Sequence, residues 1–271
     1  APASLKSMSG KISHFFHLAA LYDLSADEAS QVSANIDGTR HAIQVAETIK
    51  AGCFHHVSSI AAAGLYPGVF REDMFEEAEG LDNVYFRTKH ESEGIVRKEC
   101  KRPFRIYRPG IVIGSSKTGE MDKIDGPYYL FGLIKRMREV LPPWVPTVGL
   151  EGGRLNLVPV DWVAAALDHI AHAAKLDSRC FHLVDPAPRR IGEVLNIFAR
   201  MFAFVPSAVR QALSNLPPVR RMVNTFLRDF GIPSEVMRMI NYPTRFDTRE
   251  CERALRGSKI KFPDLKSYAW R

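Results

Sequence analysis

The chain places a tyrosine and a lysine four residues apart, Tyr85 and Lys89, in the stretch DNVYFRTKHESE. On an α-helix, residues i and i+4 lie one turn apart on the same side. An ammonium group beside a phenol favours the phenolate and lowers a pKa that is near 10 in free tyrosine. Such a pair could give a proton to a substrate oxygen near neutral pH. Chance alone supplies about 0.4 such pairs in a chain with 8 Tyr and 13 Lys, so the surroundings must decide.

The segments around this pair alternate between strand-like and helix-like patterns. An apolar, aromatic run over residues 12–20 predicts a buried strand, and helical spacing of apolar residues predicts a helix from about Ala26 to Ala51. Further strands are predicted over CFHHVSS (53–59) and FRIYRPGIVIG (104–114), the latter broken at Pro109-Gly110. The order predicts an α/β fold, with a Rossmann-type parallel sheet flanked by helices and a mainly helical C-terminal cap. From Pro188 onward the pattern predicts helices only.

Polar side chains gather where these strands end. Ser58 and Ser59 close the second predicted strand, Tyr85 and Lys89 lie on the helix that follows, and Pro109 ends the next strand. In such sheets ligands bind beyond the carboxyl ends of the strands, so both serine hydroxyls are expected to face that crevice. A serine hydroxyl can hydrogen-bond a substrate carbonyl oxygen while the phenol protonates it and hydride reaches the carbon. The sequence therefore predicts a carbonyl reduction site.

Several segments, in this order, resemble the extended short-chain dehydrogenase/reductase family, which includes the NAD-dependent epimerases and dehydratases. The resemblance covers about residues 12–185 and rests on these motifs: HLAALYD (17–23), NIDGTRHAIQVA (35–46), HHVSSIAAAG (55–64), YFRTK (85–89), YRPGIVIG (107–114) and NLVPVDWVA (156–164). It implies Ser59, Tyr85 and Lys89 as the catalytic set, with Lys89 also on the nicotinamide ribose. It implies NADPH, with NADH as the alternative, held by Leu18, Ala19, Ala20, Asn35, Ser58, Tyr85, Lys89, Pro109, Gly110 and Ile111.

Within that family, three segments are similar in sequence to the N-terminal reductase domain of bacterial two-domain fatty acyl-CoA reductases: HFFHLAALYDLSAD, YPGVFREDMFEE and FRTKHESEGIV. This implies reduction of a long-chain fatty aldehyde or a fatty acyl thioester, so the expected partner is a lipid-like carbonyl substrate, free or CoA-linked. Sugar-nucleotide epimerases or dehydratases and sterol dehydrogenases share the same catalytic set and stay open as alternatives. A non-catalytic binding or scaffold domain is the alternative from another class.

The family opens with a strand, a Gly-rich turn and a helix that hold the pyrophosphate, and no GxGxxG or GxxGxxG occurs in this sequence. The run at 12–20 resembles the fourth strand of the family fold. We therefore expect the N-terminal βαβ units to be missing, the first strand to be an exposed sheet edge, and the chain to continue into further domains of a longer polypeptide. Residues 1–114 and about 155–185 are assigned to a truncated dinucleotide-binding domain, and 115–154 and 186–271 to a substrate-binding cap.

Charge is unevenly distributed, with 9 Lys+Arg against 14 Asp+Glu in residues 1–100 and 28 against 16 in residues 101–271. The basic half favours a solvated arginine-rich face, with contact to a membrane surface or a CoA phosphate as alternatives; no motif indicates nucleic acid.

Four scattered cysteines predict reduced thiols in a cytoplasmic protein. No metal site is expected, because His14 and His17 should point to opposite strand faces. Four aromatic residues either line an apolar substrate pocket or form the ordinary core of the cap: Tyr128, Tyr129, Phe131 and Trp144.

Overall fold

The structure is a computed structural model, and it describes residues 3–22, 27–121, 153–201 and 242–270. The chain divides into two compact units. The first comprises residues 1–110, 163–186 and 243–261, and the second comprises 111–162, 187–242 and 262–271. Each unit is described by itself.

The first unit is built on a parallel sheet of four strands: β1 (His14–His17), β2 (Cys53–Val57), β4 (Phe104–Pro109) and β8 (Arg179–Leu183). They lie in the order β1-β2-β4-β8, and every neighbouring pair is parallel. This confirms the predicted α/β fold with a Rossmann-type sheet. β1 lies at one edge of this sheet, as expected, and Phe16 and Leu18 are 37% and 59% exposed there.

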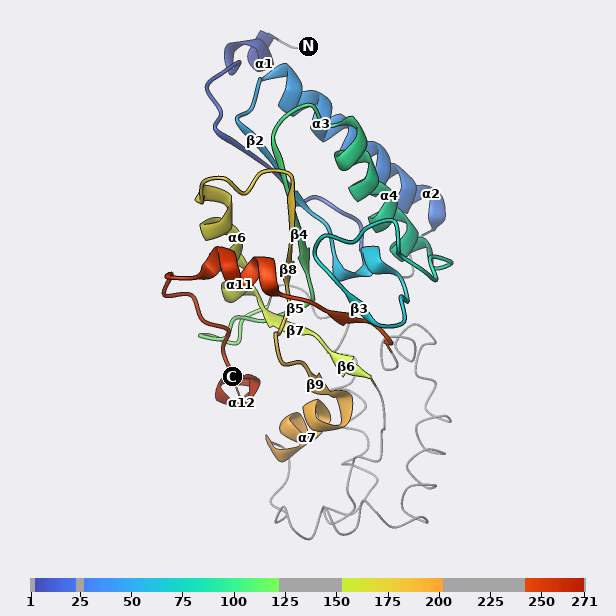
Figure 1. Ribbon diagram of the computed structural model, residues 1–271, viewed down its shortest axis with the longest axis vertical. Coiled ribbons are helices and arrows are strands. Elements are labelled where there is room, and N and C mark those ends of the chain that lie inside the picture. Colours follow the sequence, from blue (N-terminus) through green and yellow to red (C-terminus); the bar gives the residue numbers. More distant parts are fainter. Residues whose placement is uncertain (1–2, 23–26, 122–152, 202–241, 271) are drawn as a thin grey trace. The chain divides into compact units, whose positions relative to one another are not determined.

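One face of the sheet is covered by α2 (Glu28–Val32), a π-helical turn η1 (Ser33–Asp37), α3 (Gly38–Thr48) and α4 (Val84–Glu99) (Figure 1). The predicted helix from about Ala26 to Ala51 is thus three consecutive helical segments. Apolar residues of these helices, including Ile43, Ala46 and Val96, pack on Phe54 and Ile106 of the sheet. The Asn83 side chain begins α4 by accepting hydrogen bonds from the amides of Tyr85 (2.9 Å) and Phe86 (3.3 Å), as N-cap residues do.

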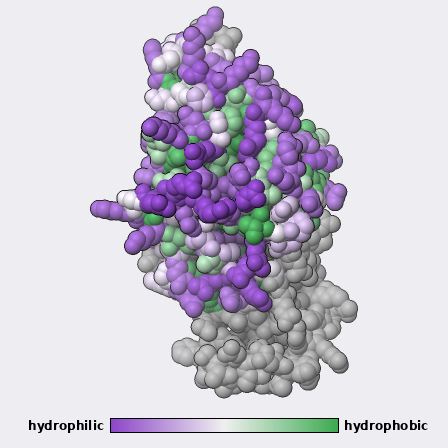
Figure 2. Space-filling model, in the orientation of Figure 1, coloured by the Kyte–Doolittle hydropathy of each residue, from purple (hydrophilic) through white to green (hydrophobic). Residues whose placement is uncertain are grey.

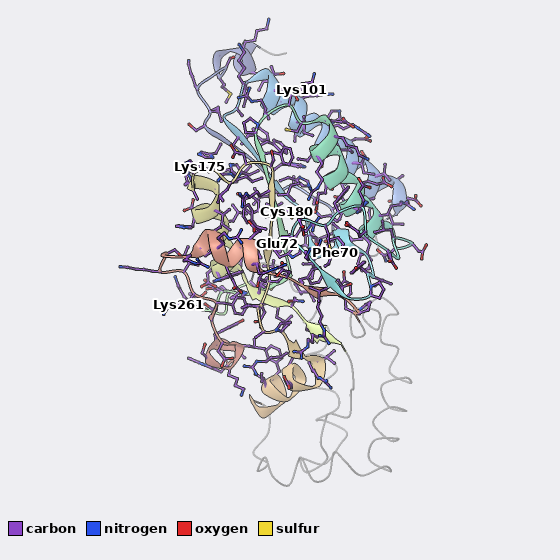
Figure 3. All side chains as sticks on the ribbon, viewed as in Figure 1. Phe70, Glu72, Lys101, Lys175, Cys180 and Lys261 are labelled. Atoms are coloured by element: carbon purple, nitrogen blue, oxygen red, sulfur yellow. The ribbon has the colours of Figure 1, made fainter. Side chains whose placement is uncertain are left out.

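The other face is covered by α6 (Val160–His172) and α11 (Arg249–Leu255). The buried Arg105 guanidinium donates to the carbonyls of Ile170 and Ala171 in α6, which supplies partners for carbonyls that a helix end leaves unpaired. Glu72 has the converse role at the start of α11: its buried carboxylate accepts from the amides of Glu250 and Cys251, and from that of His182 on β8. Figure 3 shows Glu72 next to Cys180 beside α11.

Short elements complete both units. The first also contains α1 (Ala3–Ser7), the 3₁₀ turn η2 (Ile60–Ala63), and a parallel pair of β3 (Val69–Phe70) with β10 (Arg245–Phe246). The second contains the parallel pair β5 (Ile111–Ile113) and β7 (Leu157–Pro159), the antiparallel pair β6 (Arg154–Leu155) and β9 (Arg189–Arg190), α7 (Ile191–Met201) and α12 (Leu265–Tyr268). Its buried core includes Ile113, Leu157, Ile191 and Val194.

Two expectations about the chain path can be compared with these elements. The break at Pro109-Gly110 is confirmed, because β4 ends at Pro109 and β5 pairs with β7 instead of extending the main sheet. The expectation of helices only after Pro188 is wrong, because β9 and β10 lie in that region; each is two residues long and is formed by pairing with a distant strand that no local pattern reveals. The aromatic segment assigned to a substrate pocket or to the core of the cap lies outside the described residues.

The surface contains a strongly hydrophilic band (Figure 2), and α11 carries two exposed arginines. Arg249 donates to Asp247 at 2.9 Å, and Arg253 pairs with Glu250, which also accepts from Arg179 at 2.6 Å. These exposed pairs agree with the solvated face favoured by the sequence. All four cysteines are free thiols. No helix among the described residues combines the length and apolar character that a membrane crossing requires.

Candidate active site

Tyr85 and Lys89 lie on α4, one turn apart and close to its N-terminus. Tyr85 is half-buried, whereas the Lys89 side chain is buried with 4% exposure. Its ammonium donates to the carbonyl oxygen of Val57, the last residue of β2, at 3.2 Å. Lys89 is thus fixed against the strand that leads into the two serines, and the predicted helical spacing of the pair is confirmed.

Ser59 follows β2 and begins the 3₁₀ turn η2. Its backbone is extended, and its hydroxyl oxygen accepts from the amide of Ala61 at 3.1 Å. A hydroxyl that accepts through one lone pair keeps its own proton for donation to another oxygen. The capping bond therefore fixes the direction of the side chain and leaves its hydrogen able to donate.

Ser58 differs from its neighbour. Its side chain is buried, and its hydroxyl donates to Glu93 of α4 at 3.0 Å. Alternation along β2 gives the reason, because Ser58 continues the face of Phe54 and His56 towards α3 and α4. The expectation that both hydroxyls face the crevice is therefore wrong for Ser58, and its assignment to the cofactor stays a prediction.

Asn35 connects three parts of the site. It is buried in η1, and its side chain accepts from the amide of Leu21 at 2.8 Å and donates to the Leu21 carbonyl at 2.9 Å. It also donates to the Thr88 hydroxyl at 3.1 Å, and this hydroxyl donates to the carbonyl of Tyr85 at 3.2 Å. π-helical turns frequently occur at functional sites, and here the turn carries the residue that holds α4 to the segment after β1.

We expect Asn35→Ala to lower the free energy of unfolding by about 1–3 kcal/mol, because it removes the partner of part-buried backbone groups of Leu21 and one partner of the buried Thr88 hydroxyl. Urea denaturation of the chain measures this. Gln44→Ala, an exposed change on neighbouring α3, is the control and should stay within about 0.5 kcal/mol of the parent. Equal effects of the two changes would show that the Asn35 bonds contribute nothing specific.

The other residues assigned to the cofactor lie at the ends of the strands. Leu18 and Ala19 are exposed and Ala20 is half-buried directly after β1, while Pro109 and Gly110 end β4. Because β1, β2 and β4 are parallel neighbours, these residues and Ser59 are all at the end of the sheet where the strands have their carboxyl termini. Ile111 belongs to the second unit, where its amide donates to Asn156 at 2.8 Å.

Burial changes the pKa values of titratable side chains near this end of the sheet. It lowers the pKa of Lys89 to about 8, against the opposing effect of the Glu93 carboxylate, so the amine is still mostly protonated at pH 7. Burial, with a smaller contribution from the Lys89 charge, lowers the pKa of His17 to about 4 and that of His56 well below its usual value. The ammonium therefore lies among neutral imidazoles.

We expect the free energy of unfolding to fall as the pH drops from about 6.5 towards 4. Burial lowers the pKa of His17 to about 4, those of His55 and His182 to about 3, and that of His56 well below its usual value, so the unfolded chain takes up protons that the folded chain does not. Burial also raises the pKa of Glu72 to about 7, which offsets about one of these four protons. Three net protons correspond to a slope of about 4 kcal/mol per pH unit. Urea denaturation between pH 7.5 and 4.5 measures the slope, and a flat profile would contradict it.

The buried set around Glu93 and Arg108 was missed by the sequence reasoning. The available signal was Glu93 itself, which lies one turn beyond Lys89 on the inward face of α4. His14 and His17 point to opposite faces of β1 as expected, because His14 contacts His55 whereas His17 contacts His56 and Thr39. Within the described residues, no group of three or more His, Cys, Asp or Glu side chains is placed to hold a metal ion.

Comparison with known proteins agrees with this geometry. Residues 1–167 match the NAD-binding family model described as male sterility protein. The chain belongs to this family. The predicted resemblance to extended short-chain dehydrogenases/reductases is thereby confirmed.

Relatives by sequence are much longer proteins. The nonribosomal peptide synthetase FrzA of a Cladobotryum species is 30% identical over 183 residues, which is 63% of this chain and 17% of FrzA. The glycine betaine reductase ATRR of Emericella nidulans is 28% identical over 193 residues, or 69% of this chain and 15% of ATRR. The aldehyde reductase lnbA of Aspergillus flavus is 28% identical over 182 residues, or 63% of this chain and 17% of lnbA.

Solved structures show the same fold. The terminal R domain from the myxalamid PKS-NRPS biosynthetic pathway has a TM-score of 0.73 at 24% identity, with 100% of this chain and 69% of that chain covered. RMD from Pseudomonas aeruginosa complexed with NADPH has a TM-score of 0.64 at 15% identity, with 100% and 83% covered.

Proposed function

We propose that this chain carries the carbonyl-reducing site of an NAD(P)-dependent oxidoreductase of the extended short-chain type. The observation that carries the proposal is the Lys89–Val57 hydrogen bond, which ties the helix bearing Tyr85 to the strand end that leads into Ser59. Membership of an NAD-binding family, and relatives named as reductases, support it. The residues at the carboxyl end of the strands suit the nicotinamide ribose. Lys89, Ser59 and Tyr85 offer an ammonium and two hydroxyl groups, which can donate hydrogen bonds to ribose and carbonyl oxygens.

In this proposal each side chain of the site has a defined part in the reduction. When bound, the nicotinamide cofactor supplies the hydride. The Tyr85 phenol gives its proton to the substrate carbonyl oxygen, and the Ser59 hydroxyl donates a hydrogen bond to the same oxygen. The Lys89 ammonium stabilises the phenolate left behind and holds the ribose. Asn35 keeps α4 and the segment after β1 in place through Thr88 and Leu21.

For the substrate we propose an aldehyde or an acyl thioester. Two observations support this class over sugar nucleotides: relatives are named aldehyde reductases and peptide synthetases, and the most similar structure described above is the terminal R domain of a PKS-NRPS pathway. A long-chain fatty aldehyde or fatty acyl thioester is the finer form of the proposal. We also propose that the site works within a longer polypeptide, which would supply the phosphate contacts of a Gly-rich turn.

Calorimetric titration with NADPH tests the proposal, on this chain and on a version extended upstream with the residues of its own gene. We expect binding by the extended version, and oxidation of NADPH on addition of fatty aldehydes. Turnover of aldehydes of several chain lengths then separates the finer proposal from the coarser one. Absence of NADPH binding in both versions would contradict the proposal and favour a scaffold function.

A further inference from the structure

The carboxylate of Glu93, one turn beyond Lys89 on α4, accepts hydrogen bonds from several residues next to the candidate site. Glu93 is fully buried, and five donor atoms reach its two oxygens. Oε2 accepts from Ser58 Oγ at 3.0 Å and from Arg108 Nε at 2.9 Å. Oε1 accepts from Arg108 Nη2 at 2.6 Å, and from Nη2 and Nε of Arg97 at 2.8 and 3.0 Å. The carboxylate is therefore saturated with donors and held in one orientation.

Those donors come from the elements that carry the candidate residues. Ser58 directly precedes Ser59, and Arg108 directly precedes Pro109 at the end of β4. The amide of Ser58 also donates to the carbonyl of Tyr107 at 2.8 Å, which joins the ends of β2 and β4. Since Lys89 bonds to Val57, α4 is attached to β2 at two consecutive residues, Val57 and Ser58.

We propose that Glu93 is a positioning residue for carbonyl reduction, which sets the separation of Ser59 from Tyr85 and Lys89 by holding Ser58 against α4. This inference rests on the proposed function and adds to it a residue that contacts neither substrate nor cofactor. Two attachments at consecutive residues prevent the end of β2 from sliding along the helix. Small displacements of reacting groups matter, since about 1 Å can cost about a hundredfold in rate.

Glu93 also acts on the Lys89 ammonium, which lies one turn earlier on the same helix. The Lys89 charge in turn acts on His17 from β1 and His56 from β2. Both imidazoles are neutral near pH 7, because burial lowers their pKa values. Glu93 therefore supplies the negative charge that opposes the effect of burial on the pKa of Lys89.

A matched pair of serine variants tests the positioning role in the NADPH-binding form of the protein. Ser58→Ala removes the hydroxyl that joins β2 to Glu93. Ser92→Ala removes an equally buried hydroxyl of α4 that donates only within its own helix, to the Lys89 carbonyl at 3.0 Å. We expect kcat to fall about tenfold or more in Ser58→Ala with KM for aldehyde and NADPH nearly unchanged, and to stay within about twofold in Ser92→Ala. Equal losses in the two variants would overturn the proposal.

Glu93→Gln tests the same residue without using activity. The pKa of Lys89 is followed by NMR titration of its side-chain signals, assigned with Lys89→Arg. We expect this pKa to fall below its value in the parent chain, and Glu93→Asp to restore it in part. An unchanged Lys89 titration in a folded Glu93→Gln variant would overturn the proposal. If that variant does not fold, the serine pair decides.

The two readouts separate this inference from the proposed function. A parent protein that binds NADPH but reduces no carbonyl would contradict the proposed function, and the NMR titration would still report whether Glu93 acts on Lys89. An active parent with a normal Ser58→Ala variant would contradict the positioning role alone.

Discussion

Tyr85→Phe is expected to lower kcat by about 10²–10⁴-fold in the NADPH-binding form of the protein, with KM changed little. The substitution removes the proton that the carbonyl oxygen must receive and keeps the aromatic ring, so the loss falls on the chemical step. Steady-state oxidation of NADPH with an aldehyde measures it. Because Tyr85 is half-buried in the first turn of α4, the free energy of unfolding should change little.

Tyr66→Phe is the matched control. Tyr66 is also half-buried in the first unit, where its ring packs edge-on against Phe70 with centroids 5.5 Å apart. This control should retain kcat within about twofold, because its hydroxyl has no part in the proposed proton transfer. A Tyr85→Phe variant as active as the Tyr66→Phe control would show that another group donates the proton.

The sheet and its helices were predictable because their signals are local. Apolar residues over 12–20, 53–57 and 104–109 form short runs bounded by polar or turn residues, and the structure places β1, β2 and β4 there. The four-residue spacing of Tyr85 and Lys89 predicts a shared helix face, and the Asn83 cap begins that helix two residues before Tyr85. These features depend on periodicity and on hydrogen bonds between near neighbours.

The two serines show where local reasoning ended. Period-two alternation along β2 separates Ser58 from Ser59, so their different directions could have been derived from the sequence. The hydrogen-bond partner of Ser58 could not have been derived in this way. Glu93 is 35 residues away in the chain, and its contact with Ser58 depends on how α4 packs on the sheet. The same holds for Glu72, whose carboxylate caps α11 from 178 residues away.

The buried ion pair of Glu93 with Arg108 also follows from tertiary packing. A charged residue in a strand normally predicts an exposed edge, yet Arg108 lies in β4 between β2 and β8 and is fully buried. Its guanidinium is satisfied on every side, by Glu93, by the Met74 carbonyl at 2.9 Å and by His182 at 3.1 Å. It also lies over the ring of Phe70, 5.1 Å from the centroid. Only this full set of partners makes a buried charge tolerable.

Arg108→Leu is therefore expected to lower the free energy of unfolding by about 3–5 kcal/mol, because it leaves the Glu93 carboxylate buried without its bidentate partner. Urea denaturation of the chain measures this loss. Arg71→Leu is the control, since Arg71 pairs with Asp73 at 2.9 Å in an exposed position, and its loss should change the free energy of unfolding far less.

The double variant Glu93→Leu/Arg108→Leu separates the two origins of that loss. It removes both charges, so no buried carboxylate is left without Arg108, and it should recover part of the stability lost in Arg108→Leu. The recovery would be limited, because Arg97 and Ser58 then lose their acceptor as well. The double variant could instead be less stable than Arg108→Leu by the whole loss that Glu93→Leu causes alone. The two side chains would then contribute independently, and the pair would not act as a unit.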